Sequence, residues 1–129
     1  MVIKDKTLLV VEDNISLSKI IKIKLRESGI KSVFASTGEE ALDEIKKNKP
    51  DLIWLDIYMP GINGLEVLQK IRSNPDTADI DIVIVSVSGN NKKIEFANEL
   101  GILEYFIKSN YSIDELVKSV KKIMEKDEK

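Results

Sequence analysis

The sequence predicts an α/β fold in which five parallel strands alternate with five helices, a (βα)5 arrangement. Short apolar runs rich in Val and Ile alternate five times with amphipathic segments of helical period along the 129 residues. The connections are short, and short strand–helix–strand connections produce parallel strands with right-handed crossovers. A chain of this length fits one domain, so we expect residues 1–129 to form a single domain.

The five strands are expected at the apolar runs. These are residues 7–12 (TLLVVE), 32–35 (SVFA), 51–56 (DLIWLD), 81–86 (DIVIVS) and 102–108 (ILEYFIK). The first, third and fourth runs are almost continuously apolar, which is typical of strands that helices cover on both faces of a sheet.

The helices between these strands are indicated by signals at their ends. Three pairs match or resemble the capping box: Thr37 with Glu40, Asn63 with Glu66 and Ser112 with Glu115. Gly29 and Gly101 occupy positions typical of the glycine that ends a helix. In the last helix the apolar residues at helical spacing are Ile113, Leu116, Val117, Val120, Ile123 and Met124. We interpret this stripe as a contact with the sheet rather than as a cofactor or partner groove.

The composition excludes several classes of function. The chain has no His and no Cys, which excludes Ser-His-Asp hydrolysis, phosphohistidine chemistry on this chain, disulfides and Cys-type zinc sites. The formal net charge is −2 with both signs interspersed, which argues against direct nucleic-acid binding. No stretch has the length of a membrane span, and the first residues carry acids where a signal peptide is apolar. We therefore expect a cytoplasmic protein that does not contact the membrane.

Charged and hydroxyl side chains lie at the carboxyl ends of four of the five predicted strands. They are Glu12 and Asp13 at the end of the first strand, Asp56 at the end of the third, Ser86 at the end of the fourth and Lys108 at the end of the last. In an open parallel sheet the carboxyl ends of the strands form one edge, where ligands bind. Each residue also has an ordinary interpretation as a turn acid, a strand-end serine or a surface lysine. Their coincidence at four strand ends favours one shared site.

The residue types at this edge indicate phosphoryl chemistry. Asp56 ends a buried strand, and an isolated buried carboxylate is costly unless it has a partner. Oxygen ligands without His or Cys suit Mg²⁺, and a carboxylate can accept a phosphoryl group as an acyl phosphate. Lys108 and the Ser86 hydroxyl can stabilise phosphoryl oxygens. We therefore predict that Asp56 meets a metal ion and a phosphoryl group.

Four segments, VVEDN, LDIYMPGINGLEVL, VIVSVSGN and YFIKS, resemble in order and spacing the receiver domain of bacterial two-component response regulators. The resemblance covers essentially the whole chain. It implies a doubly wound, flavodoxin-like three-layer sandwich with strand order 2-1-3-4-5. It also implies a Mg²⁺ site formed by Glu12, Asp13, Asp56 and the backbone carbonyl of Tyr58.

The resemblance further implies a signalling switch rather than an enzyme. Asp56 would be the phosphoacceptor, with Ser86 and Lys108 as the residues that contact the phosphoryl group, and Tyr105 occupies the position of an aromatic switch. The partners would be a sensor histidine kinase or phosphotransfer protein and an unknown downstream protein, which reads the face of the fourth helix, fifth strand and fifth helix. The chain would be a monomer or a weak dimer linked to phosphorylation.

Two other functions of the same topology do not fit these residues. A flavin site needs a hydroxyl- and amide-rich loop after the first strand, where this chain has Glu12 and Asp13. A phosphatase of the haloacid dehalogenase type has a second Asp where this chain has Tyr58. The alternative that stays open is a degenerate receiver that acts as a protein-interaction module without phosphorylation.

Three features depart from the usual receiver pattern. Val87 follows Ser86 where the family more often has Ala, Gly or Ser, and its branched side chain predicts narrower access and slower transfer. Ser109 follows Lys108 where the family usually has Pro, commonly through a cis bond; a cis bond before a residue other than Pro costs about 3 kcal/mol. We therefore expect a trans bond and a reshaped loop. Tyr58 and Ser88 lie where the family tunes the access of water to the phosphoaspartate, and the bulky Tyr58 predicts shielding. The chain has no residues left for an output domain, so a stand-alone receiver and a fragment of a longer regulator both remain open.

Overall fold

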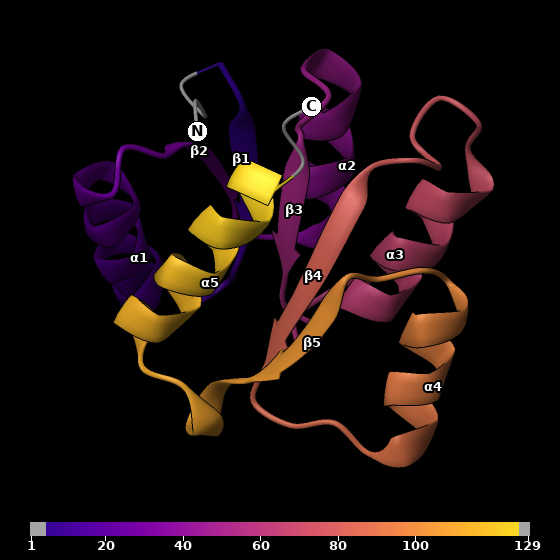
Figure 1. Cartoon of the computed structure of the whole chain (residues 1–129). Coiled ribbons are helices and arrows are strands. Elements are labelled where there is room, and N and C mark those ends of the chain that lie inside the picture. Colours follow the sequence, from indigo (N-terminus) through magenta and orange to yellow (C-terminus); the bar gives the residue numbers. More distant parts are fainter. Residues whose placement is uncertain (1–4, 127–129) are drawn as a thin grey trace.

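The structure is a computed structural model that describes residues 5–126. It contains five strands, five α-helices and one 3₁₀ turn within that range (Figure 1). In chain order these are β1 (Thr7–Val11), α1 (Ile15–Glu27), β2 (Lys31–Ala35), α2 (Gly38–Lys47), β3 (Leu52–Leu55), α3 (Gly64–Ser73), β4 (Asp81–Ser86), α4 (Asn91–Glu99), β5 (Glu104–Ile107), the turn Lys108–Asn110 and α5 (Ile113–Lys126).

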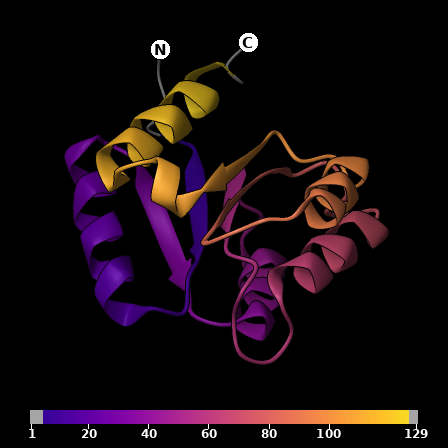
Figure 2. The same ribbon diagram turned by 90° about the horizontal axis from the view of Figure 1, so that it is seen from below.

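The strands form one parallel sheet in the order β2-β1-β3-β4-β5. This confirms the predicted doubly wound (βα)5 fold and its strand order. Figure 2 shows the sheet between two helical layers, with α1 and α5 on one side and α2, α3 and α4 on the other. The first, third and fifth strands were predicted slightly too long, because the polar residues at positions 12, 56 and 108 lie just beyond the strand ends. The second strand begins one residue earlier than predicted, and the fourth has its predicted bounds.

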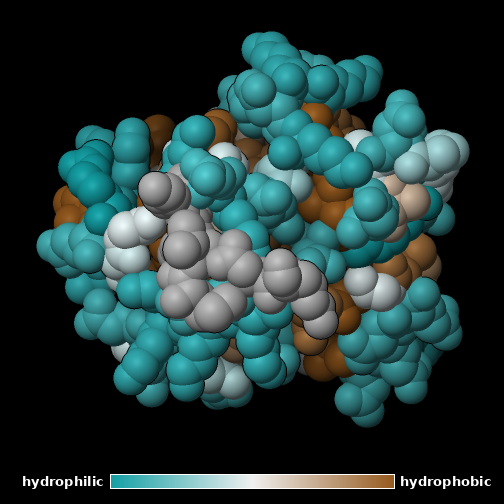
Figure 3. Space-filling view, turned by 45° about the horizontal axis from the view of Figure 1, so that its top comes forward, coloured by the Kyte–Doolittle hydropathy of each residue, from teal (hydrophilic) through white to brown (hydrophobic). Residues whose placement is uncertain are grey.

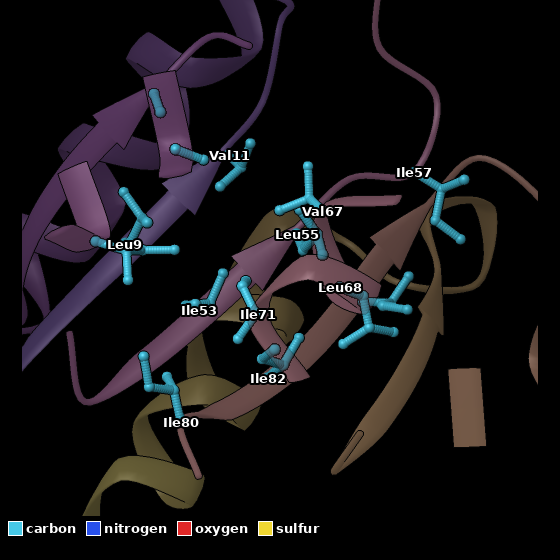
Figure 4. Close-up of a cluster of buried hydrophobic side chains, with 14 of the residues drawn as sticks. Leu9, Val11, Ile53, Leu55, Ile57, Val67, Leu68, Ile71, Ile80 and Ile82 are labelled. Carbon is cyan, nitrogen blue, oxygen red and sulfur yellow. The ribbon is translucent and has the colours of Figure 1, made fainter. Parts of the chain in front are cut away.

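The core consists of two apolar clusters, one on each face of the sheet, because successive strand residues point to opposite faces. Leu9, Ile53 and Ile82 belong to the cluster under α2, α3 and α4. Figure 4 shows these strand side chains gathered with those of α3. Leu8 and Trp54 belong to the cluster under α1 and α5. The central strands are therefore buried on both faces, as their continuous apolar runs predicted.

The apolar stripe of α5 contacts the sheet, as predicted. Leu116, Val117, Val120 and Met124 are buried in the same cluster as the strand residues of that face. The exposed surface of the molecule is largely hydrophilic in the view of Figure 3. No helix among residues 5–126 is both long enough and apolar enough to span a bilayer.

The predicted capping boxes are complete at two of the three helices. In each, the amide of the third helical residue donates to the capping side chain, and the amide of the capping residue donates to the glutamate carboxylate. The two pairs are Asn63 with Glu66 and Ser112 with Glu115. At α2 the Thr37 hydroxyl accepts from the Glu40 amide, but the Glu40 carboxylate accepts from the amide and hydroxyl of Ser36. Ser36 offers two donors, whereas a capping box would offer only the Thr37 amide. The two bonds from Ser36 hold the pKa of Glu40 below its usual range.

Two helices end at glycines with a left-handed backbone. Gly29 follows α1 with φ 76° and Gly101 follows α4 with φ 85°, a region that residues with a side chain rarely adopt. Both positions agree with the sequence prediction. The C-terminal end of α4 is also bound by Arg72 of α3, whose guanidinium donates to the carbonyls of Leu100 and Gly101 at 2.7 and 2.9 Å.

Candidate functional site

The site lies at the carboxyl ends of the central strands, where the strand order reverses between β1 and β3. Glu12 follows β1, Asp56 follows β3 and Ser86 ends β4. The amides of Glu12 and Asp56 continue the backbone pairing beyond the strands, with bonds of 3.0 and 3.1 Å to the carbonyls of Ala35 and Val11. Strand pairing therefore holds both carboxylates at the centre of this edge.

Three carboxylates converge here, as predicted. One carboxylate oxygen each from Glu12, Asp13 and Asp56 lies within 4.8 Å of the other two. Glu12 and Asp56 are each only 3% exposed, and Asp13 is more exposed. Acidic side chains this deeply buried need a cationic partner, and a group of oxygen ligands alone fits a hard divalent cation.

Lys108 lies in the same pocket. Its ammonium nitrogen is 2.8 Å from Glu12 Oε1 and 3.5 Å from Asp56 Oδ2. The lysine reaches the acids from the end of β5, at the start of the 3₁₀ turn. One ammonium opposes three carboxylates, so the pocket keeps an excess of negative formal charge that a divalent cation can balance.

The environment of Asp56 opposes ionisation of its carboxyl group. The pKa of Asp56 is raised to about 6, chiefly because the carboxyl group is buried. Lys108 acts in the opposite direction, and the nearby Glu12 carboxylate contributes to the rise. The Tyr58 amide donates to Asp56 Oδ1 at 3.2 Å and favours the charged form. Near neutral pH the carboxylate is therefore mostly ionised, but buried and only partly compensated.

Ser86 and Tyr105 lie beside this pocket on β4 and β5. The Ser86 hydroxyl is fully buried and, with the Trp54 indole, is one of two buried side-chain groups among residues 5–126 that have no hydrogen-bond partner. Leaving a buried hydroxyl without a partner costs about 1–3 kcal/mol of folding free energy. A ligand that accepts a hydrogen bond from Ser86 would remove this cost. The Tyr105 hydroxyl donates to the Ser88 carbonyl at 2.9 Å.

Two glycines that the sequence analysis did not identify shape this edge. A Cβ atom on Gly64 would overlap the Asp56 carbonyl oxygen and lie 2.7 Å from the Ile57 Cα atom, and the Gly64 amide closes the loop with a 2.8 Å bond to the Ile57 carbonyl. A Cβ atom on Gly89 would lie 2.7 Å from ring carbons of Tyr105. The only signal in the sequence was a glycine within a polar turn, which does not reveal a close approach in space.

The loop after β5 agrees with the prediction for Lys108 and Ser109. No peptide bond among the described residues is cis, so the bond between them is trans. The chain instead forms the 3₁₀ turn Lys108–Asn110. This reshaped loop leaves the ammonium of Lys108 beside the acids.

The fold and this pocket define a doubly wound α/β protein with a buried acidic pocket at the switch point of its sheet. The family model for the response regulator receiver domain matches residues 8–121, so the chain belongs to this family of two-component signalling modules.

Individual relatives agree with this assignment. Sporulation initiation phosphotransferase F of Bacillus subtilis is 30% identical over 120 residues, which are 93% of this chain and 94% of that protein. The phosphate regulon transcriptional regulatory protein PhoB of Pseudomonas aeruginosa is 30% identical over 92% of this chain, but the chain spans only 52% of that protein. The crystal structure of the response regulator TrrA of Thermotoga maritima in complex with Mg²⁺-BeF is 36% identical with a TM-score of 0.78, and the match covers 92% of this chain and 98% of that one.

Proposed function

We propose that this chain is a phosphorylation-dependent switch of a two-component phosphorelay and that Asp56 is its phosphoacceptor. The observation that carries the proposal is the buried Asp56 carboxylate in one pocket with two other acids and the Lys108 ammonium. A purely structural role does not account for a carboxylate that burial penalises in this way.

The proposed metal ligands are the carboxylates of Glu12, Asp13 and Asp56 and the backbone carbonyl of Tyr58. The spacing of the three carboxylates and the absence of His and Cys from the chain support Mg²⁺. When bound, the ion would neutralise charge on the phosphoryl oxygens. TrrA supports this proposal, because its structure contains Mg²⁺ together with a beryllium fluoride.

In the proposed transfer an oxygen of the Asp56 carboxylate attacks phosphorus. The new oxygen–phosphorus bond forms as the phosphorus–nitrogen bond of a phosphohistidine breaks, and the leaving imidazole keeps the electron pair and takes a proton from water. Lys108 balances the charge on the phosphoryl oxygens, and the unpaired Ser86 hydroxyl donates to one of them. The phosphohistidine must come from a partner, since this chain has no His.

In the proposed switch, a bond from Ser86 to the phosphoryl group draws the loop after β4 toward the site. That loop carries Ser88, whose carbonyl accepts from Tyr105. Movement of the loop therefore changes the packing of Tyr105 and the face formed by α4, β5 and α5. A downstream protein would read this face, and a sensor histidine kinase or phosphotransfer protein would supply the phosphoryl group.

Phosphorylation by a small donor tests the proposal. The protein is incubated with Mg²⁺ and acetyl phosphate, and intact mass is measured for the wild type and for Asp56→Asn. We expect the wild type to gain the mass of one phosphoryl group, only when Mg²⁺ is present, and the variant to gain none. No gain in the wild type, or an equal gain in the variant, would instead support the degenerate receiver that binds partners without phosphorylation.

A further inference from the structure

The Tyr58 side chain connects the loop after β3 with the loop after β4 and with the first turn of α4. Its backbone amide donates to Asp56, while its hydroxyl accepts from Ser88 Oγ at 3.3 Å and from the Lys93 ammonium. The same ammonium lies 4.3 Å from the centre of the Tyr58 ring. One side chain thus bridges three segments of the chain.

The position of this bridge relative to the pocket follows from its two ends. Tyr58 lies two residues beyond Asp56, and Ser88 lies two residues beyond Ser86, on neighbouring strands β3 and β4. Residues 58 and 88 therefore lie on neighbouring loops, each two residues further from the sheet than Asp56 and Ser86. The hydrogen bond between Ser88 and Tyr58 therefore lies at the same edge of the sheet as Asp56 and Ser86.

Lys93 makes two contacts with the Tyr58 side chain. Its ammonium donates a hydrogen bond to the Tyr58 hydroxyl and also lies over the ring as a cation. The backbone of Lys93 is itself anchored, because its amide donates to the capping side chain of Asn90 at 2.9 Å. The backbone of Lys93 is therefore fixed in the first turn of α4, and the residue is half-buried.

We infer that Lys93 is a positioning residue that holds the Tyr58 ring across the entrance to Asp56 and thereby slows the hydrolysis of the phosphoaspartate. This inference rests on the proposed function. Tyr58 acts as a movable cover, Ser88 supports it weakly, and Lys93 keeps it closed. The lifetime of the phosphorylated state is thus set partly from α4, outside the pocket.

The contact also couples α4 to the entrance in both directions. A partner that binds α4 and engages the Lys93 ammonium, for example with a carboxylate, removes the bond to Tyr58 and exposes the phosphoaspartate to water. By linkage, a closed cover favours the position of α4 in which Lys93 reaches Tyr58. Binding at this helix and decay of the phosphoryl group then depend on each other.

The test compares Lys93→Met with Lys92→Met in the full chain. Lys92 is the exposed neighbour in the same turn, so both variants lose one positive charge from α4. Each protein is loaded with acetyl phosphate and Mg²⁺, the donor is removed, and the loss of the phosphoryl group is followed by intact mass. We expect decay to be at least about 5-fold faster in Lys93→Met, because the ring loses both a hydrogen bond and a cation–π contact, and unchanged in Lys92→Met.

Two further measurements separate positioning from a general loss of structure. Lys93→Arg keeps a cation and its donors and should restore slow decay. Hydrogen–deuterium exchange of a peptide covering residues 57–63, measured without phosphorylation, should be faster in Lys93→Met than in Lys92→Met. Equal decay and equal exchange in the two Met variants would overturn the inference while leaving the proposed function intact. A wild type that acetyl phosphate does not modify would instead refute the proposed function, and this inference with it.

Discussion

At the scale of single residues, Asp56 carries a charge that its surroundings compensate only in part. The carboxylate is almost completely buried, and its strongest opposite charge, Lys108, is 3.5 Å away and shared with Glu12. Burial therefore outweighs pairing, and the pKa lies at about 6. A group of this kind destabilises the metal-free fold whenever it is charged.

Replacing Asp56 by Asn should stabilise the metal-free protein near neutral pH. The pKa of Asp56 is raised in the folded state above its ordinary 3.8, so the protonated carboxyl contributes stability below about pH 4 that is lost as the pH rises through about 6. The gain in the free energy of unfolding should approach, at most, about 3 kcal/mol above pH 7. Urea unfolding in the presence of a chelator, from about pH 5 to pH 8, measures it.

The matched comparison is the pH dependence of the difference between the two proteins. The advantage of Asp56→Asn should grow as the pH increases through this range, because only the wild type acquires the buried charge. A variant that is less stable than the wild type at the upper end would mean that Asp56 is well compensated. The premise that its carboxylate awaits a cation would then be wrong.

The close-packed glycines belong to the same scale. Gly64 lets α3 begin directly against the Asp56 carbonyl, and Gly89 leaves space for the Tyr105 ring. At both positions the missing side chain is what matters, rather than a special backbone angle. The two glycines thus allow the close packing around Asp56 and Tyr105 and have no side chain that could react.

At the scale of elements, α4 is held at both ends by side chains from elsewhere. Lys93 near its start contacts Tyr58, and the Leu100 and Gly101 carbonyls at its end accept from Arg72 of α3. Arg72 also donates to the Ala78 carbonyl at 3.0 Å before β4. Carbonyls at the end of a helix lack partners within the helix, so this guanidinium fixes where α4 ends.

Arg72→Met should destabilise the protein by about 2–4 kcal/mol, because three carbonyls lose a charged donor and some of them stay partly buried. The measurement is urea unfolding. Lys70→Met is the control, since Lys70 is an exposed cation of the same helix, and its effect should stay within about 0.5 kcal/mol. Equal effects of the two substitutions would show that the guanidinium bonds do not stabilise the end of α4.

At the scale of the whole molecule, the acidic pocket joins segments that follow β1, β3 and β5. A ligand that binds this pocket only in the folded state must stabilise the entire sheet, since the ligand groups separate when the strands do. The pocket is therefore a point where binding and folding are linked.

Mg²⁺ should raise the free energy of unfolding of the wild type. At a free concentration one hundred times its dissociation constant the increase should be about 2.7 kcal/mol, measured by urea unfolding with the fluorescence of Trp54, the one tryptophan of the chain. Asp13→Asn removes one carboxylate of the pocket and should lose most of this increase. A potassium salt at equal ionic strength controls for screening, and an equal increase with that salt would contradict a specific metal site.

Much of the fold and of the pocket could be predicted from local patterns. The apolar runs predicted the strands, and the end signals predicted Gly29, Gly101 and two complete capping boxes. The polar residues after β1, β3 and β5 were predicted to meet, because parallel strands align their carboxyl ends at one edge. The roles proposed for those residues stay predictions until phosphorylation and metal binding are measured.

Other features could not be predicted, because they depend on contacts between segments that no local pattern relates. Lys93 lies 35 residues from Tyr58, and Arg72 lies 28 residues from Leu100. Both are ordinary helix cations in the sequence. Glu40 shows the same limit at short range, since its carboxylate could bond to Thr37 or to Ser36, and the two donors of Ser36 decided the outcome.

Periodicity, end signals and the residues at strand ends were enough to predict the (βα)5 arrangement and the members of its acidic pocket, because these depend on short-range order and on the regular geometry of a parallel sheet. The strand order was predicted from the resemblance to receiver domains. The depth at which Asp56 is buried, the ring of Tyr58 across the two loops and the attachment of α4 at both ends came from tertiary packing alone. They depend on how closely loops and helices approach one another in space, which the spacing of residues along a chain does not encode.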